Sequence, residues 1–381
     1  MLILIFFNLI FISSYMKFVF ASYVKGSTYK DSEAWITRIR AYTSILEALG
    51  ANNEIISIEQ IDYEGEYFKN GVRYIFRRFN KAELRVPIKL NRFIKQLKPD
   101  VVFIQSLHFP LQVILLRLAI GRKPGIIIQN HAEKPFTGIK KYLLRWADKY
   151  IDAYLFASKD MGMDWVTKGN IPSPGKIHEV MEVSSVFYPV DKSEALKKTD
   201  ALGQPVFLWV GRLDKNKDPL TVVKAFIEFI KLSPPARLYM IYHTEELLDD
   251  IKNALNKHHI SADTITLIGT VPNEEMLYWY NSADFIISGS HYEGSGTAVC
   301  EAMSCGCVPV VTDIFSFRMM TNNGNIGLLY EAGNVTALVA VLKQTRQLDM
   351  HDQKRRGLAY FRSTLSFEAI AGKIQVIAAS C

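Results

Sequence analysis

The sequence predicts an α/β protein with two doubly wound domains, each a parallel sheet covered by helices on both faces, that face each other across a cleft. Its 381 residues are more than twice the usual length of a domain that folds around a single hydrophobic core. Apolar runs of strand length alternate with segments of helical periodicity, which is typical of parallel sheets. The alternation stops in the polar stretch 191–204 and restarts beyond it, so we expect one domain over 16–190 and another over 200–360.

The composition indicates a globular chain. Apolar residues make up 49% and charged residues 22%, which excludes a disordered tail, a collagen and a coiled coil. Three of the four cysteines, Cys300, Cys305 and Cys307, fall in one short stretch, and the fourth is Cys381. A secreted disulfide framework would spread them, so we expect a cytoplasmic protein whose clustered thiols are buried apolar groups rather than zinc ligands.

Six strands are expected in each half. In the first half they cover 18–24, 55–58, 101–105, 126–129, 153–157 and 177–183, and a helix with regular apolar spacing covers 33–49. In the second half they cover 206–210, 237–241, 264–269, 285–288, 308–312 and 327–330. Helices are expected from Pro219, from Thr297 to a stop at Gly306, and over 366–380. Ligands of such sheets bind at the carboxyl ends of the strands.

The first fifteen residues are almost wholly apolar. About 20 apolar residues are needed to span a bilayer, and this run is interrupted at Asn8 and stops before Lys17. A signal peptide would open with positive charge, which is absent here. Because Met16 opens a β-rich run, we expect the natural protein to start there. The alternative is that residues 1–15 form an anchor that dips into a membrane.

The first half carries most of the positive charge. Residues 1–190 hold 26 Lys and Arg against 17 Asp and Glu, and residues 191–381 hold 19 against 21. Ten cations lie between Lys69 and Lys98, interleaved with Tyr74, Phe76, Phe79 and Phe93. Such a segment can attract an anionic membrane, a nucleic acid or an acidic substrate, with a solvated helix face as the alternative.

A candidate diphosphate site follows the strand 206–210. Gly211 allows a ligand to approach the backbone, and Arg212 and Lys217 place two cations beside the start of a helix, where the dipole also attracts anions. The chain has neither a dinucleotide fingerprint nor a P-loop at this place. The alternative is a basic loop that only ends a strand.

A second candidate loop follows the strand 285–288. Glu293 precedes Gly294, Ser295, Gly296 and Thr297, whose amides are expected at a helix N-terminus, and Glu301 lies inside that helix. Two carboxylates at different depths can address different parts of one bound molecule. Glu301 is suited to a pair of ribose hydroxyls, and the loop amides to phosphate or sugar oxygens.

At these residues the chain resembles the retaining family 4 glycosyltransferases, also called glycosyl transferases group 1, which have the GT-B fold. The resemblance rests on the Glu-x7-Glu spacing of Glu293 and Glu301, on Gly211-Arg-Leu followed by Lys217, and on the run that begins at Gly306. It extends over 207–334 and reaches the first half only through the architecture. It implies two Rossmann-like domains, of which the first binds an acceptor and the second a nucleotide sugar. It also implies that a helix over 361–381 crosses back to the first domain.

The roles of the residues in the second domain follow from this resemblance. It implies that Arg212 and Lys217 stabilise the departing nucleoside diphosphate, that Glu301 binds the ribose and that Glu293 contacts the transferred sugar. The amides from Gly294 to Thr297 would line the pocket. The family transfers the sugar with retention, and the absence of an Asp-x-Asp sequence agrees with a reaction that needs no metal or other cofactor.

In the first half the resemblance is weaker. His131 follows an apolar strand and matches a histidine of the family. Gly26 stands where members of the family commonly have a pair of glycines that contacts phosphate, and here Ser27 replaces the second glycine. His108 follows a neighbouring strand and is a weaker candidate, and both histidines have a structural alternative.

The expected function is therefore transfer of a sugar from a UDP- or GDP-linked donor to a glycan or lipid-linked acceptor in cell-surface polysaccharide biosynthesis. The enzyme would lie in the cytoplasm, with the basic segment against the inner face of the membrane. Nucleic acid is not an expected partner, because no binding motif for it appears. The alternatives are a nucleotide-sugar epimerase, a phosphorylase or a catalytically silent sugar-nucleotide binder of the same architecture.

Overall fold

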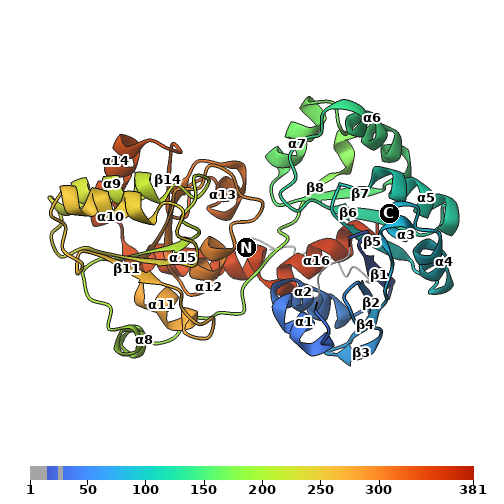
Figure 1. Cartoon of the computed structure of the whole chain (residues 1–381), viewed down its shortest axis with the longest axis horizontal. Helices are drawn as coiled ribbons and strands as arrows, with labels where there is room; N and C mark the ends of the chain where they lie inside the picture. The colour runs from blue at the N-terminus through green and yellow to red at the C-terminus, as the bar shows by residue number, and fades with distance from the viewer. Residues whose placement is uncertain (1–14, 25–28) are drawn as a thin grey trace, which may run out of the picture.

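The computed structural model describes residues 15–24 and 29–381. The apolar residues before Tyr15 lie outside this part of the chain, and so does Gly26. The molecule has two lobes, one around each sheet, with the blue-to-green first domain on the right in Figure 1 and the second domain on the left. No helix among the described residues is long and apolar enough to cross a membrane.

The first sheet has eight strands in the order β3-β4-β2-β1-β5-β6-β7-β8, all parallel except β3. Their bounds are β1 Lys17–Ala21, β2 Glu54–Glu59, β3 Gly65–Lys69, β4 Val72–Phe76, β5 Val101–Gln105, β6 Gly125–Gln129, β7 Ala153–Phe156 and β8 Ile177–Glu179. The helices of this half are α1 Ser32–Arg38, α2 Arg40–Gly50, α3 Lys81–Arg85, α4 Ile88–Gln96, α5 Pro110–Ile120, α6 Gly138–Ala147 and α7 Lys159–Thr167.

The second sheet has six parallel strands in the order β11-β10-β9-β12-β13-β14. They are β9 Val206–Gly211, β10 Arg237–Tyr242, β11 Ile265–Gly269, β12 Phe285–Ser288, β13 Val308–Thr312 and β14 Leu328–Tyr330. The helices are α8 Lys192–Thr199, α9 Pro219–Ile230, α10 Leu248–Lys257, α11 Met276–Ser282, α12 Thr297–Ser304, α13 Phe315–Met320, α14 Val335–Gln344, α15 Met350–Tyr360 and α16 Phe367–Ala378.

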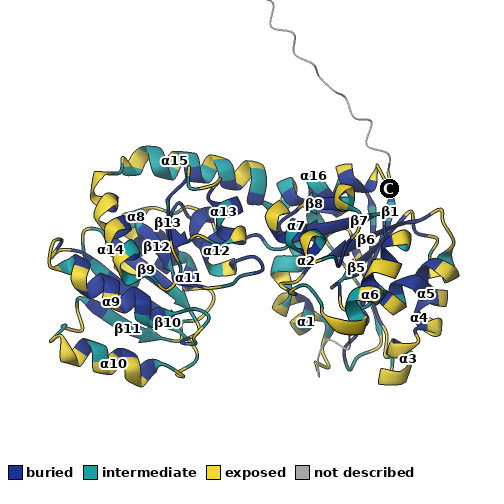
Figure 2. Ribbon diagram, turned by 90° about the horizontal axis from the view of Figure 1, so that it is seen from above, coloured by how far each residue is buried: buried dark blue, intermediate teal, exposed yellow. Residues whose placement is uncertain are grey.

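The central strands of both sheets are buried on both faces. Phe18 and Phe20 of β1 and Phe207 and Trp209 of β9 are at most 1% exposed. Figure 2 shows these strands in dark blue beneath the helices. Two covered, doubly wound sheets were expected from the near-continuous apolar runs, and the structure confirms this fold class.

Several elements differ from the expectations. The helix expected over 33–49 is two helices, α1 and α2, because Ile39 leaves the helical conformation with φ −102° and ψ 25°. The strand expected over 177–183 ends at Glu179. The antiparallel hairpin β3–β4 was not expected, and the polar stretch that begins at Asp191 contains α8, whose first turn the Asp191 carboxylate caps.

The basic segment 69–98 forms no single helical face. It covers the turn and second strand of the β3–β4 hairpin and then α3 and α4. Tyr74 and Phe76 are fully buried, while Phe79 and Phe93 are partly buried and pack against the core. The alternation of β4 turns Tyr74 and Phe76 into the core, so these two rings cannot contribute to a membrane contact of the basic segment.

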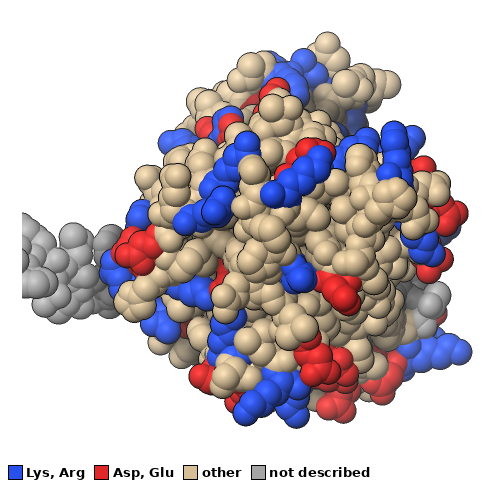
Figure 3. Space-filling view, turned by 90° about the vertical axis from the view of Figure 1, so that its left-hand side faces the viewer, with Lys and Arg blue, Asp and Glu red and all other residues tan. Residues whose placement is uncertain are grey.

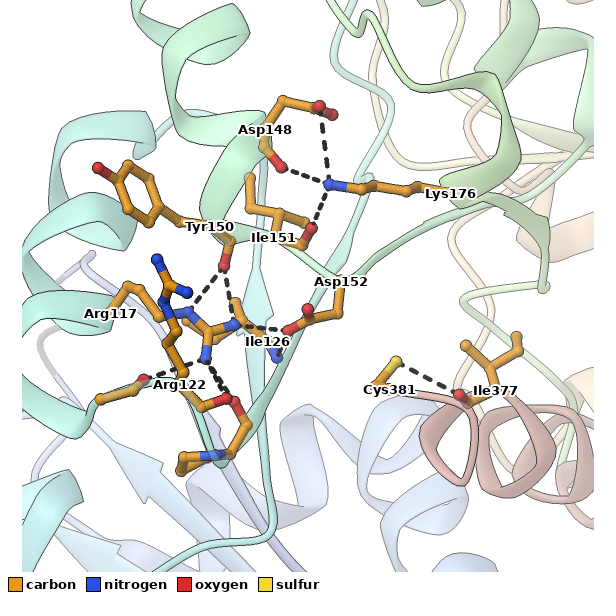
Figure 4. Close-up of polar contacts among 12 residues, drawn as sticks. Arg117, Arg122, Ile126, Asp148, Tyr150, Ile151, Asp152, Lys176, Ile377 and Cys381 are labelled. Carbon is orange, nitrogen blue, oxygen red and sulfur yellow. Dashed lines mark hydrogen bonds and ion pairs between the residues drawn. The ribbon is translucent and has the colours of Figure 1, made fainter.

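Helix α16 packs against α2 of the first domain, next to it in Figure 1. The Asn53 side chain donates a hydrogen bond of 2.6 Å to Gln375 on this helix. Beyond α16, Cys381 lies against Gly125, where a Cβ atom would come within 2.9 Å of the cysteine Cβ. Nearby, the buried Arg117 donates to the carbonyl of Tyr150 at 2.9 Å and pairs with Asp152, which fixes the ends of α5 and β7 (Figure 4).

Candidate active site

A cavity of about 810 Å³ lies between the domains, where the loops that follow β9 and β12 face the first domain. Its lining from the second domain includes most residues expected in the site: Gly211, Arg212, Lys217, Glu293, Gly294, Ser295, Gly296, Thr297 and Glu301. From the first domain, Arg38, Ala132 and Glu182 line it. This is the position that a doubly wound sheet gives to a ligand, and the volume suits a small molecule.

The two cations expected in the site after β9 differ in exposure. The Arg212 side chain is 53% exposed and its Nη2 lies 3.1 Å from Oδ2 of Asp214, whereas the Lys217 side chain is 23% exposed. Asp214 also accepts a hydrogen bond of 2.9 Å from the Lys217 backbone, which shapes the turn. Helix α9 starts directly beyond, with Asp218 as its cap and Pro219 in the first turn as expected.

The two candidate loops are joined to each other. Asn216 donates to the carbonyl of Tyr292 at 3.0 Å, and the His291 backbone donates to the carbonyl of Asn216 at 2.8 Å. The His291 ring contacts Asp218 at 3.1 Å. Lys217 itself forms an ion pair with Glu293, whose side chain is 13% exposed. The structure thus places a cation and a carboxylate from the loops after β9 and β12 side by side in the lining of the cavity.

Two glycines permit the tight course of the loop before α12. A Cβ at Gly294 would lie 2.6 Å from Ala132 Cβ and 3.0 Å from Oε1 of Glu182, both in the first domain. Gly296 has φ +61°, a conformation that glycine adopts readily, and it precedes the first turn of α12. No side chain caps this helix end, so its first amides remain available at the cavity.

Glu301 lies in the second turn of α12, and its carboxylate accepts a hydrogen bond of 2.7 Å from the Tyr280 hydroxyl. Burial raises the pKa of Glu301, and the hydrogen bond from Tyr280 opposes the rise. None of the ion pairs among the described residues includes Glu301. A carboxylate in this position can accept hydrogen bonds from a ligand in the cavity that Glu301 lines.

His131 faces the same region from the first domain but lines a neighbouring cavity. Its Nδ1 contacts Glu182 and its Nε2 contacts Gln105. Burial alone would lower the pKa of His131, but the hydrogen bond and charge of Glu182, with the charge of Glu133, raise it above the usual value. His131 is therefore stabilised in its protonated form beside a carboxylate that also lines the interdomain cavity.

Two candidates of the first half stand apart. Gly26 lies outside the described residues, so its phosphate contact stays a prediction. His108 is exposed, stacks on Phe136 at 5.3 Å and meets Lys140 at 2.6 Å, and it lines none of the cavities described here. Burial and the charge of Lys140 lower the pKa of His108.

Three residues that line these cavities were not predicted from the sequence: Glu182, Gln105 and Arg38. Glu182 follows β8, where an extended run was expected, so its place at a strand end went unseen. Gln105 ends β5, and the rule that ligands lie at carboxyl ends would have found it. Arg38 is one of many cations in the first half, and no spacing distinguishes it.

The clustered thiols are buried, as expected: Cys300 is 0%, Cys305 8% and Cys307 4% exposed. Burial raises the pKa of Cys300 and of Cys305, that of Cys305 to about 12. In residues 15–24 and 29–381 no group of three or more His, Cys, Asp or Glu side chains is arranged to hold a metal ion.

Residues 191–357 match the family model of the glycosyl transferases group 1. O-antigen chain mannosyltransferase B of Escherichia coli is 27% identical over 198 residues, which are 50% of this chain and 51% of the relative. The GDP-mannose:cellobiosyl-diphosphopolyprenol alpha-mannosyltransferase of Xanthomonas oryzae pv. oryzae is 24% identical over 172 residues, 44% of each chain. The matches thus span about half the length of these relatives.

The likeness to solved structures extends over the whole chain. Anabaena Alr3699/HepE in complex with UDP superposes with a TM-score of 0.71 at 12% identity, covering 96% of this chain and 100% of that one. At such identity the likeness shows the fold. It confirms the GT-B arrangement that the resemblance implied, and the family model confirms the resemblance in the second half.

Proposed function

Because residues 191–357 match the family model of the glycosyl transferases group 1 and the described part of the chain has the GT-B fold, we propose that this protein transfers a sugar from a nucleotide-sugar donor to a glycan or lipid-linked acceptor. The observation that carries the proposal is the interdomain cavity, which gathers Arg212, Lys217, Glu293 and Glu301 with the open end of α12. The two cations can bind the diphosphate of a nucleotide sugar, and the two carboxylates can accept hydrogen bonds from its hydroxyl groups.

The chemistry of the site supports stabilisation of a leaving diphosphate. As the bond between the sugar and the diphosphate breaks, negative charge develops on the diphosphate. Fixed cations in a cleft stabilise that charge most in the transition state. Arg212 and Lys217 supply such cations, together with the amides at the start of α12. We propose that the reaction proceeds without a metal ion and with retention, as the Glu-x7-Glu spacing suggests by its resemblance to the family.

Glu301 and Glu293 would divide the donor between them. Glu301 on α12 would accept hydrogen bonds from the ribose hydroxyls, and Glu293 on the loop before α12 would contact the transferred sugar. The UDP complex of one structural neighbour and the GDP-mannose named for one relative support a UDP- or GDP-linked donor. The O-antigen and diphosphopolyprenol named for the relatives support a role in cell-surface polysaccharide synthesis.

A lipid-linked acceptor would be met at a membrane, and the face formed by α4, α5 and α6 is suited to one. These helices pack side by side, and none of them contains Asp or Glu. Their exposed cations include Arg92, Lys95 and Arg145. The same three helices also carry large exposed apolar side chains: Ile88, Leu111, Leu118, Ile139, Tyr142 and Trp146. A basic surface with exposed apolar side chains is typical of attachment to an anionic leaflet.

The test of the proposed function is nucleotide release. The purified full chain is incubated with UDP-glucose, UDP-galactose, UDP-N-acetylglucosamine or GDP-mannose and a membrane extract as acceptor, in excess EDTA. We expect one donor to be turned over, and Arg212→Ala or Lys217→Ala to lower that rate by about 100-fold or more. Lys215→Ala is the matched control, because it removes a cation from the same loop that does not line the cavity.

A protein that binds these nucleotides without releasing them would be a silent binder. A product that differs from the donor only in one sugar stereocentre would indicate an epimerase. A rate that appears only when magnesium or manganese is added would contradict the metal-independent mechanism.

A further inference from the structure

A further cavity between the domains, of about 390 Å³, lies beside α7 and is called the α7 cavity below. It is separate from the larger cavity of about 810 Å³ at the candidate active site, the active-site cavity, but Glu293 lines both. Charged side chains from the two domains make up much of the lining of the α7 cavity: Glu133, Lys134, Asp164, Lys168, Asp313 and Arg318. A cavity of this size with so many polar groups has room and hydrogen-bond partners for water.

Tyr292 joins the two domains where these cavities meet. Its hydroxyl donates to the carbonyl of Ala132 at 3.1 Å, with the carbonyl of Glu133 as a second acceptor at 3.3 Å. Tyr292 lines the α7 cavity and Ala132 lines the active-site cavity, so this contact lies in the partition between them. The Lys134 ammonium lies 4.6 Å from the centre of the Tyr292 ring, which adds a cation–π contact to the same bridge.

The first domain presents the two carbonyls on an ordered loop after β6. Ala132 has φ +65°, which is strained in a residue with a Cβ atom and persists where surrounding contacts impose it. The buried Glu133 carboxylate supplies such contacts, since it accepts hydrogen bonds from the Asn130 side chain at 2.8 Å and from the His131 backbone. The loop therefore has internal contacts that hold both carbonyls in place for Tyr292.

The second domain holds Tyr292 through the two loops of the candidate donor site. The Tyr292 carbonyl accepts a hydrogen bond of 3.0 Å from Asn216 of the loop after β9, and Glu293 follows directly in the chain. At Gly294 a Cβ atom would lie 2.6 Å from that of Ala132, so the domains also touch beyond Glu293. Tyr292 thus connects the loops of the candidate donor site to the first domain.

The Tyr292 hydroxyl is a hydrogen-bond donor near neutral pH. Burial raises the pKa of Tyr292 to about 12. The charges of Glu133, Glu182 and Asp164 contribute to the rise. A protonated phenol can donate to a backbone carbonyl, whereas a phenylalanine ring cannot. Tyr292→Phe would therefore remove the hydrogen bond between the domains and keep the ring under Lys134.

Water that crossed this partition would compete with the acceptor. Under the proposed function the transferred sugar lies at Glu293, which both cavities share. A water molecule there can attack the anomeric carbon in place of an acceptor hydroxyl. The bond from that carbon to the diphosphate oxygen then breaks with its electron pair leaving on the diphosphate, the sugar is released with the hydroxyl group of the water, and the remaining proton passes to the diphosphate or to solvent. Closed active sites suppress such side reactions by excluding water.

We propose that Tyr292 is a positioning residue, whose hydroxyl holds the loop of Glu293 on the loop of His131 and closes the partition, so that the donor sugar reacts with the acceptor rather than with water. The inference rests on the proposed transfer function. Tyr292 acts through its neighbours, because it lines the α7 cavity and not the active-site cavity. Loss of its hydroxyl should therefore change the fate of the sugar and leave the affinity for the nucleotide unchanged.

The test compares the fate of the sugar with the affinity for the nucleotide. The full chain is given the donor found in the release assay, radiolabelled in its sugar, with the membrane extract as acceptor, and free and transferred sugar are separated and counted. In Tyr292→Phe we expect the ratio of free to transferred sugar to rise about ten-fold, an effect of the size of one lost hydrogen bond. The calorimetric Kd for UDP or GDP should stay the same.

Tyr278→Phe on α11 is the matched control. Lys198 lies over the Tyr278 ring at 5.9 Å, as Lys134 lies over that of Tyr292, and Tyr278 is in the lining of neither cavity. We expect this variant to have the ratio of the unchanged protein. Tyr292→Ala, which removes the ring as well as the hydroxyl, should raise the ratio at least as far as Tyr292→Phe.

The outcomes separate this inference from the proposed function. A ratio that stays the same in both Tyr292 variants, with nucleotide binding intact, overturns the role of Tyr292 and leaves the transfer function standing. An equal fall in free and transferred sugar also overturns it, because a merely structural defect lowers both. If the unchanged protein binds neither UDP nor GDP, the proposed function fails and the role of Tyr292 fails with it.

Discussion

Lys217 and Glu293 form an ion pair, and the proposed function assigns the two groups to different parts of the donor. The side chains are 23% and 13% exposed, so each would be left as a poorly solvated charge if the other were removed. When the diphosphate binds, Lys217 can exchange the carboxylate for phosphate oxygens, which frees Glu293 to contact the sugar. Under the proposed function, the ion pair would compensate both charges before a donor binds.

This pairing predicts non-additive effects on stability. Lys217→Met and Glu293→Gln should each lower the free energy of unfolding, and the double variant should lose less than their sum, with a coupling of about 0.5–3 kcal/mol. Urea unfolding of the four proteins measures it. Strictly additive losses would show that the ion pair contributes nothing. Lys215→Met with Glu293→Gln is the control pair, because no ion pair among the described residues joins Lys215 to Glu293.

Substitution of Glu301, unlike that of Lys217 or Glu293, is expected to leave the protein equally or more stable at pH 8. Since burial raises the pKa of Glu301, its contribution to stability is present below the unfolded pKa of about 4.5 and is lost as the pH rises through the higher folded pKa. Glu301→Gln removes that cost and keeps an acceptor for Tyr280. We expect its melting temperature to equal or exceed that of the unchanged protein at pH 8, with a smaller difference at pH 5. A large loss at pH 8 in scanning calorimetry would refute this.

At the scale of elements, α16 supports the wall that holds His131. Ile374 is 3% exposed and lines a small cavity together with Gln105 and His131, whereas Val376 on the same helix is 58% exposed. Ile374→Ala should cost about 2–5 kcal/mol of unfolding free energy, and Val376→Ala well under 1 kcal/mol. Chemical denaturation followed by circular dichroism compares the two. Equal losses would mean that α16 is not packed as described.

Elements with local signals could be predicted from the sequence. The apolar runs gave most strands of both sheets, and Pro219 and Gly306 marked a helix start and a helix end correctly. The β3–β4 hairpin also has a local signal that was overlooked. Asn70 and Gly71 stand between its strands with φ +48° and +81°, and an Asn-Gly pair is the commonest two-residue hairpin turn.

The residues that gather at the cavity in the second domain could also be predicted from local signals in the sequence. Arg212, Lys217, Glu293 and Glu301 lie on short segments with recognisable spacings, so each segment could be assigned separately. Glu59 and Glu182 have no such spacing, and only the order of the strands in the first sheet brings them to one cavity. The ion pair of Lys217 with Glu293 was also hidden, because 76 residues separate the two in the chain.

For the molecule as a whole, charge distinguishes its two ends. The end formed by the second domain shows Lys and Arg interspersed with Asp and Glu in Figure 3. The face of α4, α5 and α6 on the first domain carries cations and exposed apolar side chains without an acid in the three helices. A molecule attached through that face would keep its second domain away from the lipid.

This arrangement predicts salt-sensitive membrane binding. The full chain should sediment with phosphatidylglycerol vesicles and not with phosphatidylcholine vesicles, because each cation near an anionic leaflet contributes up to about 1 kcal/mol. Arg92→Glu with Lys95→Glu on α4 should abolish sedimentation. Lys252→Glu with Lys257→Glu on α10, two exposed cations of the second domain, should not. If the α4 variant still binds and a protein started at Met16 does not, attachment belongs to the first fifteen residues.

Calorimetric titration of UDP and GDP into the unchanged protein, Glu301→Gln and Glu293→Gln tests the proposed donor site most directly. We expect one nucleotide to bind the unchanged protein and Glu301→Gln to weaken that binding about ten-fold or more, because the ribose loses its acceptor. Glu293→Gln should bind the same nucleotide as well or better, since Lys217 is released from its ion pair. If neither nucleotide binds, or if the two variants lose affinity equally, the proposed donor site is wrong.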